Sequence, residues 1–153
     1  AGEKPEWLWE CEAMTKEELK SCRMAAIARN RVIERIKNLK KSVGCVGGIR
    51  YDNEPRSRGE PLSKQQQYVE ALEQLAEEYE ETTIPWARQA AAVERAIRSL
   101  PPDLGELIRL RYMEGLRWEE VNENMGAMFR KDAISERTSK RMHREALTRL
   151  QNI

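Results

Sequence analysis

Residues 103–126 read DLGELIRLRYMEGLRWEEVNENMG, and residues 135–150 read SERTSKRMHREALTRL. In both stretches apolar residues recur every three or four positions, which is the spacing that lines one side of a helix. Asp103 opens the first stretch as a helix cap, and Gly115 and Gly126 stand where helices would end. The pattern therefore predicts two short helices, followed by a longer helix that begins at Ser135.

The predicted last helix has two faces of different chemistry. The core-facing residues recur at helical spacing and are Ser139, Met142, Ala146, Leu150 and Ile153. The opposite face carries Arg137, Lys140, Arg141 and Arg144. Between positions 130 and 150 seven basic residues oppose three acidic ones, a net charge of 7 − 3 = +4. Such a face suits a DNA groove or its phosphates, although ordinary surface helices also carry charge of this kind.

Two longer helices are predicted upstream of these stretches. Apolar residues recur at helical spacing from Thr15 to about Val43, and Ser63 with Gln66 forms the capping box of a second helix. Residues 44–62 between them contain Gly and Pro that interrupt any helical or strand period, which predicts a flexible loop. We expect the two helices to pair as an antiparallel hairpin.

Charge is unevenly distributed along this hairpin, although the net charge of the chain is only +1. Residues 14–50 carry ten Lys and Arg against three Asp and Glu, which gives 10 − 3 = +7. Residues 69–82 carry six Glu and no basic residue, a net charge of −6. The opposite signs indicate either attraction between the two helices or two separately solvated faces.

Composition and proline placement define the predicted architecture. The chain has 40% hydrophobic and 35% charged residues with a single Phe, which favours helices with narrow apolar stripes. Pro85 disfavours helical geometry at the preceding residue, so a kink or a restart is expected there. We predict an all-α chain in which residues 1–84 form the hairpin with its 44–62 loop, and residues 85–153 form a helix-turn-helix bundle.

Catalysis and metal binding have no visible framework in the sequence. A single His, no HExxH pair and no Gly-rich phosphate loop argue against an enzyme, a bound metal or a cofactor. Cys11, Cys22 and Cys45 lack CxxC spacing, so neither a zinc site nor a disulfide framework is expected. No apolar run approaches the length of a membrane span, and we expect a cytoplasmic protein. Residues 1–13, which precede Met14, fit a leader, a short extra helix or an added segment that is not native to the protein.

Five runs of the second half carry a family resemblance: Ala96–Leu100, Leu107–Tyr112, Gly115–Val121, Ser135–Thr138 and His143–Leu147. Together they resemble region 4 of sigma-70 factors, and they resemble still more the phage and prophage regulators of the RinA and ArpU kind. The specific match covers about residues 93 to 151. The front half is similar in layout, because those regulators also place an interrupted helical hairpin before the sigma-like part.

The resemblance implies that Ser135 caps a recognition helix that reads duplex DNA. The residues that it places near DNA are Glu136, Arg137, Ser139, Lys140, Arg141 and Arg144. Two features depart from the family pattern. Arg117 stands where a Ser or Thr cap is usual, and the turn at 127–133 is longer than the usual one. The longer turn either adds Arg130 and Lys131 as phosphate contacts or tilts the recognition helix away from standard reading.

The function expected from the sequence is sequence-specific DNA binding by a transcriptional regulator of phage or prophage origin. Its expected partners are double-stranded DNA and RNA polymerase or other host transcription machinery, with the hairpin forming a homodimer or contacting that machinery. Two alternatives stay open at this point. One is a helical interaction or oligomerisation protein that does not bind DNA, and the other is a DNA packaging component similar to a terminase small subunit.

Overall fold

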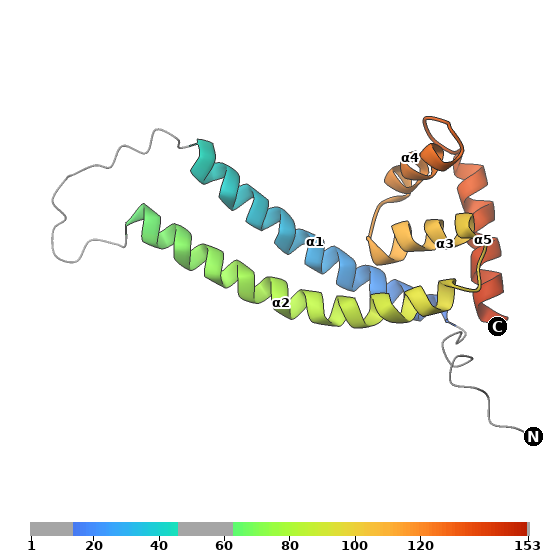
Figure 1. Cartoon of the computed structure of the whole chain (residues 1–153), viewed down its shortest axis with the longest axis horizontal. Coiled ribbons are helices and arrows are strands. Elements are labelled where there is room, and N and C mark those ends of the chain that lie inside the picture. The colour runs from blue at the N-terminus through green and yellow to red at the C-terminus, as the bar shows by residue number, and fades with distance from the viewer. Residues whose placement is uncertain (1–13, 46–62, 153) are drawn as a thin grey trace, which may run out of the picture.

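The structure, a computed structural model, describes residues 14–45 and 63–152. The described residues are helical, with no strand among them, which confirms the all-α prediction. The elements are α1 (Lys16–Cys45), α2 (Lys64–Ile97), α3 (Pro102–Ile108), the π-helical turn η2 (Arg109–Met113), α4 (Trp118–Met128) and α5 (Glu136–Gln151). The helices α1 and α2 form a long antiparallel hairpin that projects from the cluster of α3, α4 and α5 (Figure 1).

Reciprocal caps begin both hairpin helices, and the sequence predicts the one at Ser63. The Thr15 amide donates to the Glu18 carboxylate at 3.3 Å, and the Glu18 amide donates to the Thr15 hydroxyl at 3.2 Å. Ser63 and Gln66 form the same arrangement before α2. The helix α1 extends through Cys45, so its last two residues replace the start of the predicted loop. The predictions for residues 1–13, for 46–62 and for Ile153 lie outside the described residues.

The helix α2 continues through Pro85 without a restart. Proline removes one amide donor from the helix, but residues on both sides of it are held by packing, with Leu75 buried on one side and Ala90 and Val93 on the other. Figure 1 shows α2 as a gently curved helix rather than two helices. The predicted boundary at 84/85 therefore falls inside one continuous element.

One apolar core joins the base of the hairpin to the three C-terminal helices. It includes Leu19, Cys22, Val93, Ile97, Leu107, Ile108, Val121, Met125, Met142, Ala146 and Leu150. Polar contacts tie the same parts together, because the Trp86 indole donates to the Met113 carbonyl at 2.7 Å and the Met14 amide donates to the Leu150 carbonyl at 3.3 Å. The first of these bonds joins α2 to η2, and the second joins the start of the hairpin to α5.

The turn between α4 and α5 is built around Gly126. The sequence predicts that this glycine ends a helix, but α4 continues to Met128 and Gly126 is buried inside its last turn. A Cβ atom there would lie 2.6 Å from the Ala133 Cα and 2.8 Å from the Lys131 carbonyl oxygen. The Lys131 amide donates to the Gly126 carbonyl at 2.9 Å, and the Ile134 amide donates to the Asn122 carbonyl at 3.0 Å. Gly126 therefore permits the chain to fold back closely onto α4.

Gly115 supplies the stop that the sequence predicts before α4. Its φ of +73° lies in the left-handed region that a residue without a Cβ adopts at little cost.

Among the described residues, no helix is both long and apolar enough to cross a membrane.

We predict that Gly126→Ala destabilises the protein while Gly105→Ala does not. The methyl group added at position 126 would overlap backbone atoms of residues 131 and 133, which cannot move aside without opening the turn, so a loss of about 1–3 kcal/mol is expected. At Gly105, also buried and helical, the nearest atom to an added Cβ is the Ile97 carbonyl oxygen at 3.7 Å, an ordinary contact. Thermal unfolding measured by circular dichroism tests both variants. Equal melting temperatures for the two would contradict this account of the turn.

Candidate nucleic-acid interface

The helix α5 begins where the sequence predicts and buries the predicted side. The Ser135 hydroxyl accepts from the Thr138 amide at 3.1 Å and thereby caps the helix. Ser139, Met142, Ala146 and Leu150 are buried in the core. This apolar side fixes the rotation of α5, so the residues on its other side must face outward.

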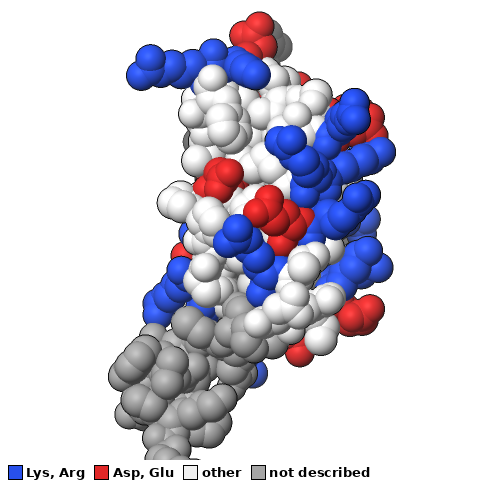
Figure 2. Space-filling view, turned by 90° about the vertical axis from the view of Figure 1, so that its right-hand side faces the viewer, with Lys and Arg blue, Asp and Glu red and all other residues white. Residues whose placement is uncertain are grey.

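The outward side of α5 carries three arginines with no charge partner among the residues that the structure describes. Arg137, Arg141 and Arg144 follow at steps of four and three, all three are exposed, and none forms an ion pair with a described residue. Lys140 is exposed as well, but its ammonium group lies 2.9 Å from the Glu136 carboxylate. Basic side chains line one edge of the surface seen from the α5 side, with acidic groups between some of them (Figure 2). We call Arg137, Arg141 and Arg144 the α5 arginine face.

Ser139 does not belong to this surface. Its helical spacing predicts a core position while the family resemblance places it among the DNA contacts, and its burial agrees with the core position. Its relative exposure is 1%, and its hydroxyl donates to the Glu136 carbonyl at 2.9 Å inside the helix. Met142 and the rest of the buried side keep it from any external ligand.

Arg130 and Lys131 lie in the turn that precedes α5, and both are exposed. Arg130 adopts a φ of +55°, which is uncommon for a residue with a side chain. The hydrogen bonds around Gly126 hold this turn in one conformation, so these two cations have a defined position near the start of α5. The turn predicted at 127–133 begins two residues later, because Ala127 and Met128 belong to α4, and its backbone hydrogen bonds fold it against that helix.

Two other arginines of the sigma-like runs are engaged within the protein. The Arg109 guanidinium donates to Glu94 at 2.8 Å and to Glu106 at 2.6 Å. The hydrogen bond from Arg109 lowers the pKa of the Glu94 carboxyl below its usual value. Arg111 donates to the Leu116 carbonyl at 2.9 Å and lies over the Trp118 ring, 4.7 Å from its centre. Arg109 therefore joins η2 to α2 and α3, and Arg111 packs against the first residue of α4.

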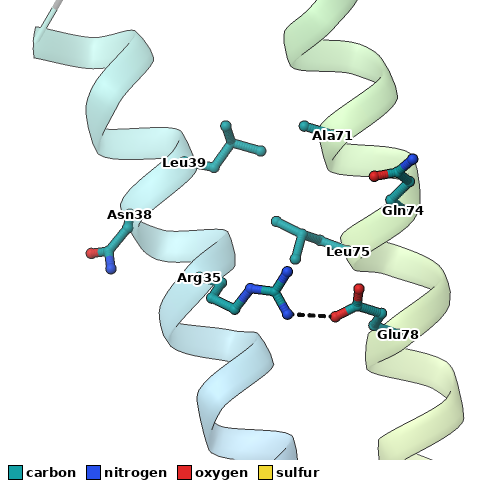
Figure 3. A pocket seen from close by; sticks show the side chains of 7 residues that line it. All are labelled: Arg35, Asn38, Leu39, Ala71, Gln74, Leu75 and Glu78. Carbon is teal, nitrogen blue, oxygen red and sulfur yellow. Dashed lines mark hydrogen bonds and ion pairs between the residues drawn. The ribbon is translucent and has the colours of Figure 1, made fainter.

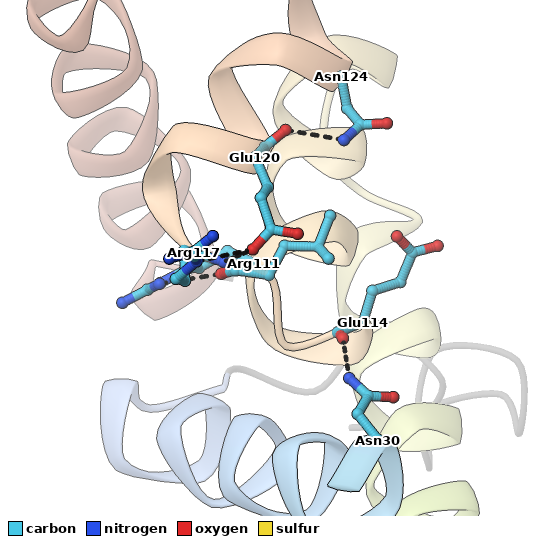
Figure 4. Close-up of polar contacts among 7 residues, drawn as sticks. Asn30, Arg111, Glu114, Arg117, Glu120 and Asn124 are labelled. Carbon is cyan, nitrogen blue, oxygen red and sulfur yellow. Dashed lines mark hydrogen bonds and ion pairs between the residues drawn. The ribbon is translucent and has the colours of Figure 1, made fainter. Parts of the chain in front are cut away.

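Arg117 occupies the N-cap position of α4, where its side chain makes no capping hydrogen bond to the helix. The Glu120 carboxylate accepts from the Arg117 side chain at 3.0 Å and from the Arg117 amide at 3.4 Å (Figure 4). An arginine side chain cannot accept the first-turn amide hydrogens as a serine would. Glu120 thus makes one of the two hydrogen bonds of a capping box, the one in which its carboxylate accepts from the amide of the N-cap residue.

A half-buried histidine joins α5 to the helix before it. His143 Nε2 lies 2.6 Å from the Tyr112 hydroxyl, and its ring meets the Trp118 ring edge-on at a centroid distance of 4.9 Å. Burial, reinforced by the positive charges of Lys16 and Arg111, lowers the pKa of His143 from 6.5 to about 4. The imidazole is therefore neutral at pH 7 and serves as a packing and hydrogen-bonding group. Helical spacing alone gave no signal for this cluster, because its members come from three separate elements.

The cysteines do not assemble into a metal site among the described residues. No group of three His, Cys, Asp or Glu there is placed to hold a metal ion. Cys22 lies in the core, where burial raises the pKa of its thiol to about 11. The prediction for Cys11 and for the side chain of Cys45 lies outside what the structure describes.

We predict that His143→Gln removes part of the acid sensitivity of the fold. Because the folded pKa of about 4 lies below the unfolded value of 6.5, the neutral histidine stabilises the fold above pH 6.5, and this contribution is lost as the pH falls toward 4. The wild type should lose about 2 kcal/mol more stability than the variant between pH 7 and pH 4.5. Urea unfolding at the two pH values measures the difference. An identical loss in both proteins would show that His143 is not the titrating group.

Comparisons with protein-family models, with curated proteins and with solved structures found no match for this chain. The resemblance to sigma region 4 therefore stays a prediction.

Proposed function

We propose that this protein binds double-stranded DNA through the α5 arginine face and acts as a sequence-specific transcriptional regulator of phage or prophage origin. The observation that carries the proposal is that one side of α5 is buried, while the opposite side exposes three arginines that form no ion pair with a described residue. A helix presented in this way is rigid, and its cations are pre-placed for a polyanion. The transcriptional and phage parts of the proposal come from the sequence resemblance.

The dimensions of α5 suit a DNA groove. Its 16 residues correspond to about 24 Å, and the major groove, about 12 Å wide, admits an α-helix. Arg137 and Arg144 are seven residues apart, or about 10 Å along the axis. This span lets one arginine reach base edges while another contacts the phosphates that border the groove.

The start of α5 offers the groups that base recognition needs. Helix-turn-helix proteins contact bases mainly with the first residues of the recognition helix. Arg137 can donate two hydrogen bonds to the O6 and N7 atoms of a guanine, and the Glu136 carboxylate can accept from the amino group of a cytosine. Arginine also binds phosphate through two parallel hydrogen bonds, which a lysine cannot reproduce. The arginine content of this face therefore supports specific recognition as well as general attraction.

The first test is a triple variant, Arg137→Ala with Arg141→Ala and Arg144→Ala. A duplex selected by the full-length protein from a random pool serves as the ligand, and fluorescence anisotropy gives the dissociation constant over a range of salt concentrations. Each lost phosphate contact removes about 0.9 from the slope of log K against log salt. We expect affinity to fall by at least about 100-fold at moderate salt, together with a shallower salt dependence.

The matched control removes the same charge from elsewhere on the molecule. Arg31, Arg88 and Arg95 are exposed on α1 and α2 and form no ion pair with a described residue. Changing these three to Ala should reduce affinity only slightly. If both triple variants weaken binding equally, the attraction comes from overall charge and the proposed face is wrong. If the wild type selects no sequence and binds no duplex, the result favours the alternative of a helical interaction protein that does not bind DNA.

A second prediction separates base recognition from affinity. Glu136→Ala removes a negative charge beside the arginines, so binding to an unrelated duplex should strengthen, while the preference for the selected duplex should fall by about 10-fold, as one lost base contact costs roughly 1–3 kcal/mol. Glu145→Ala is the control, because Glu145 lies in the same helix, pairs with Arg149 and is also exposed to solvent. The Glu145→Ala variant should change the affinity for the selected duplex and for the unrelated duplex by the same factor. A preference unchanged by Glu136→Ala would exclude this carboxylate from base recognition.

A further inference from the structure

The outer half of the hairpin projects from the core with little packing of its own (Figure 1). Among the described residues of α1, Asn30 is the one nearest the outer end of the hairpin that makes a side-chain hydrogen bond to the C-terminal part of the chain. It donates to the Glu114 carbonyl at 2.8 Å (Figure 4). Beyond it, only Val32 of α1 and Leu75 of α2 are buried among the described residues. An isolated pair of helices leaves its apolar side chains half covered, and a further helical layer would bury them.

One flank of this outer hairpin is closed by an ion pair. Arg35 and Glu78 join α1 to α2 at 2.6 Å, beside Leu39 and Leu75, which point into the space between the helices (Figure 3). Residues two positions apart on a helix point about 200° apart. Ile33 and Ala76, which precede Arg35 and Glu78 by two, therefore both lie on the opposite flank.

This opposite flank combines apolar residues with unpaired charges. Ile33 and Leu72 are partly exposed, Val69 is 47% exposed, and Ala76 is exposed. The same flank carries four exposed charged residues that form no ion pair with a described residue. They are Lys37 and Lys40 on α1 and Glu73 and Glu80 on α2. One half of the flank is thus basic and the other half acidic, with an apolar strip between them.

We propose that this flank is the contact surface for a second copy of the same chain, which forms a four-helix bundle with the first. A two-fold axis parallel to the hairpin places α1 of each copy over α2 of the other, so that basic faces acidic in both halves. A two-fold axis across the hairpin would instead stack α1 on α1 and α2 on α2, with like charges opposed. The charge pattern therefore selects the first arrangement over the second.

The register of the hairpin agrees with this arrangement. Leu39 lies opposite Ala71 and Arg35 opposite Leu75 across the hairpin (Figure 3). By the same spacing, Lys37 stands level with Glu73. Rotation about an axis along the hairpin preserves height, so Lys37 of one copy meets Glu73 of the other without any sliding of the helices. The proposal stands independently of DNA binding.

A charge-swap experiment on full-length chains tests the interface. One variant carries Lys37→Glu with Lys40→Glu, and the other carries Glu73→Lys with Glu80→Lys. Sedimentation velocity should give a mass of twice 17.8 kDa for the wild type and 17.8 kDa for each variant alone. An equimolar mixture of the variants should return to twice that mass, because each reversed face then meets an opposite one.

The control is a swap on the outward sides of the same helices, Lys41→Glu with Glu77→Lys, which should stay dimeric. Circular dichroism verifies that every variant retains its helix content. A monomeric wild type would overturn the proposal. Variants that stay dimeric when separate, or a mixture that stays monomeric, would overturn it too, because the charges named here would then not determine assembly. Loss of DNA binding without a change in mass would count against the proposed function alone.

Discussion

The structure depends on the burial of one side of α5 in a core to which both ends of the chain contribute. Ala146 and Leu150 are fully buried, and the Leu150 carbonyl accepts a hydrogen bond from the Met14 amide at the start of the hairpin. Burial of an apolar side chain of the size of leucine is worth about 1.5–3 kcal/mol, so several such residues hold the helix in one rotation. Because this rotation of α5 is fixed, Arg137, Arg141 and Arg144 all face outward, and packing in the core is enough to set their common direction.

Much of the fold could be predicted from the sequence because it is set by local rules. Helical spacing identified the buried side of α5, the Ser135 hydroxyl capped it as expected, and Gly115 ended the preceding helix. These features depend on residues within one or two turns of each other. The all-helical class followed from the same periodicity.

The parts that could not be predicted depend on residues distant in the chain. Gly126 has the position of a helix stop, yet its role is to let Ala133 approach, which only the folded turn reveals. Pro85 has the position of a break, yet packing on both sides keeps α2 continuous. Arg109 lies in the sigma-like run Leu107–Tyr112, yet its partner Glu94 comes fifteen residues earlier in the chain and only the folded structure brings the two together. The candidate interface was likewise predicted in outline, while the removal of Ser139 from it required a measure of burial.

The unbroken course of α2 gives the molecule a mechanical property. Its 34 residues correspond to about 50 Å of helix, which runs from the core near α5 to the far end of the hairpin. A rigid rod of that length acts as a lever arm, and a swing of about 5° at its root displaces its tip by about 4 Å. A force on the far end of α2 is thereby carried along one continuous helix to its buried residues Val93 and Ile97 in the core.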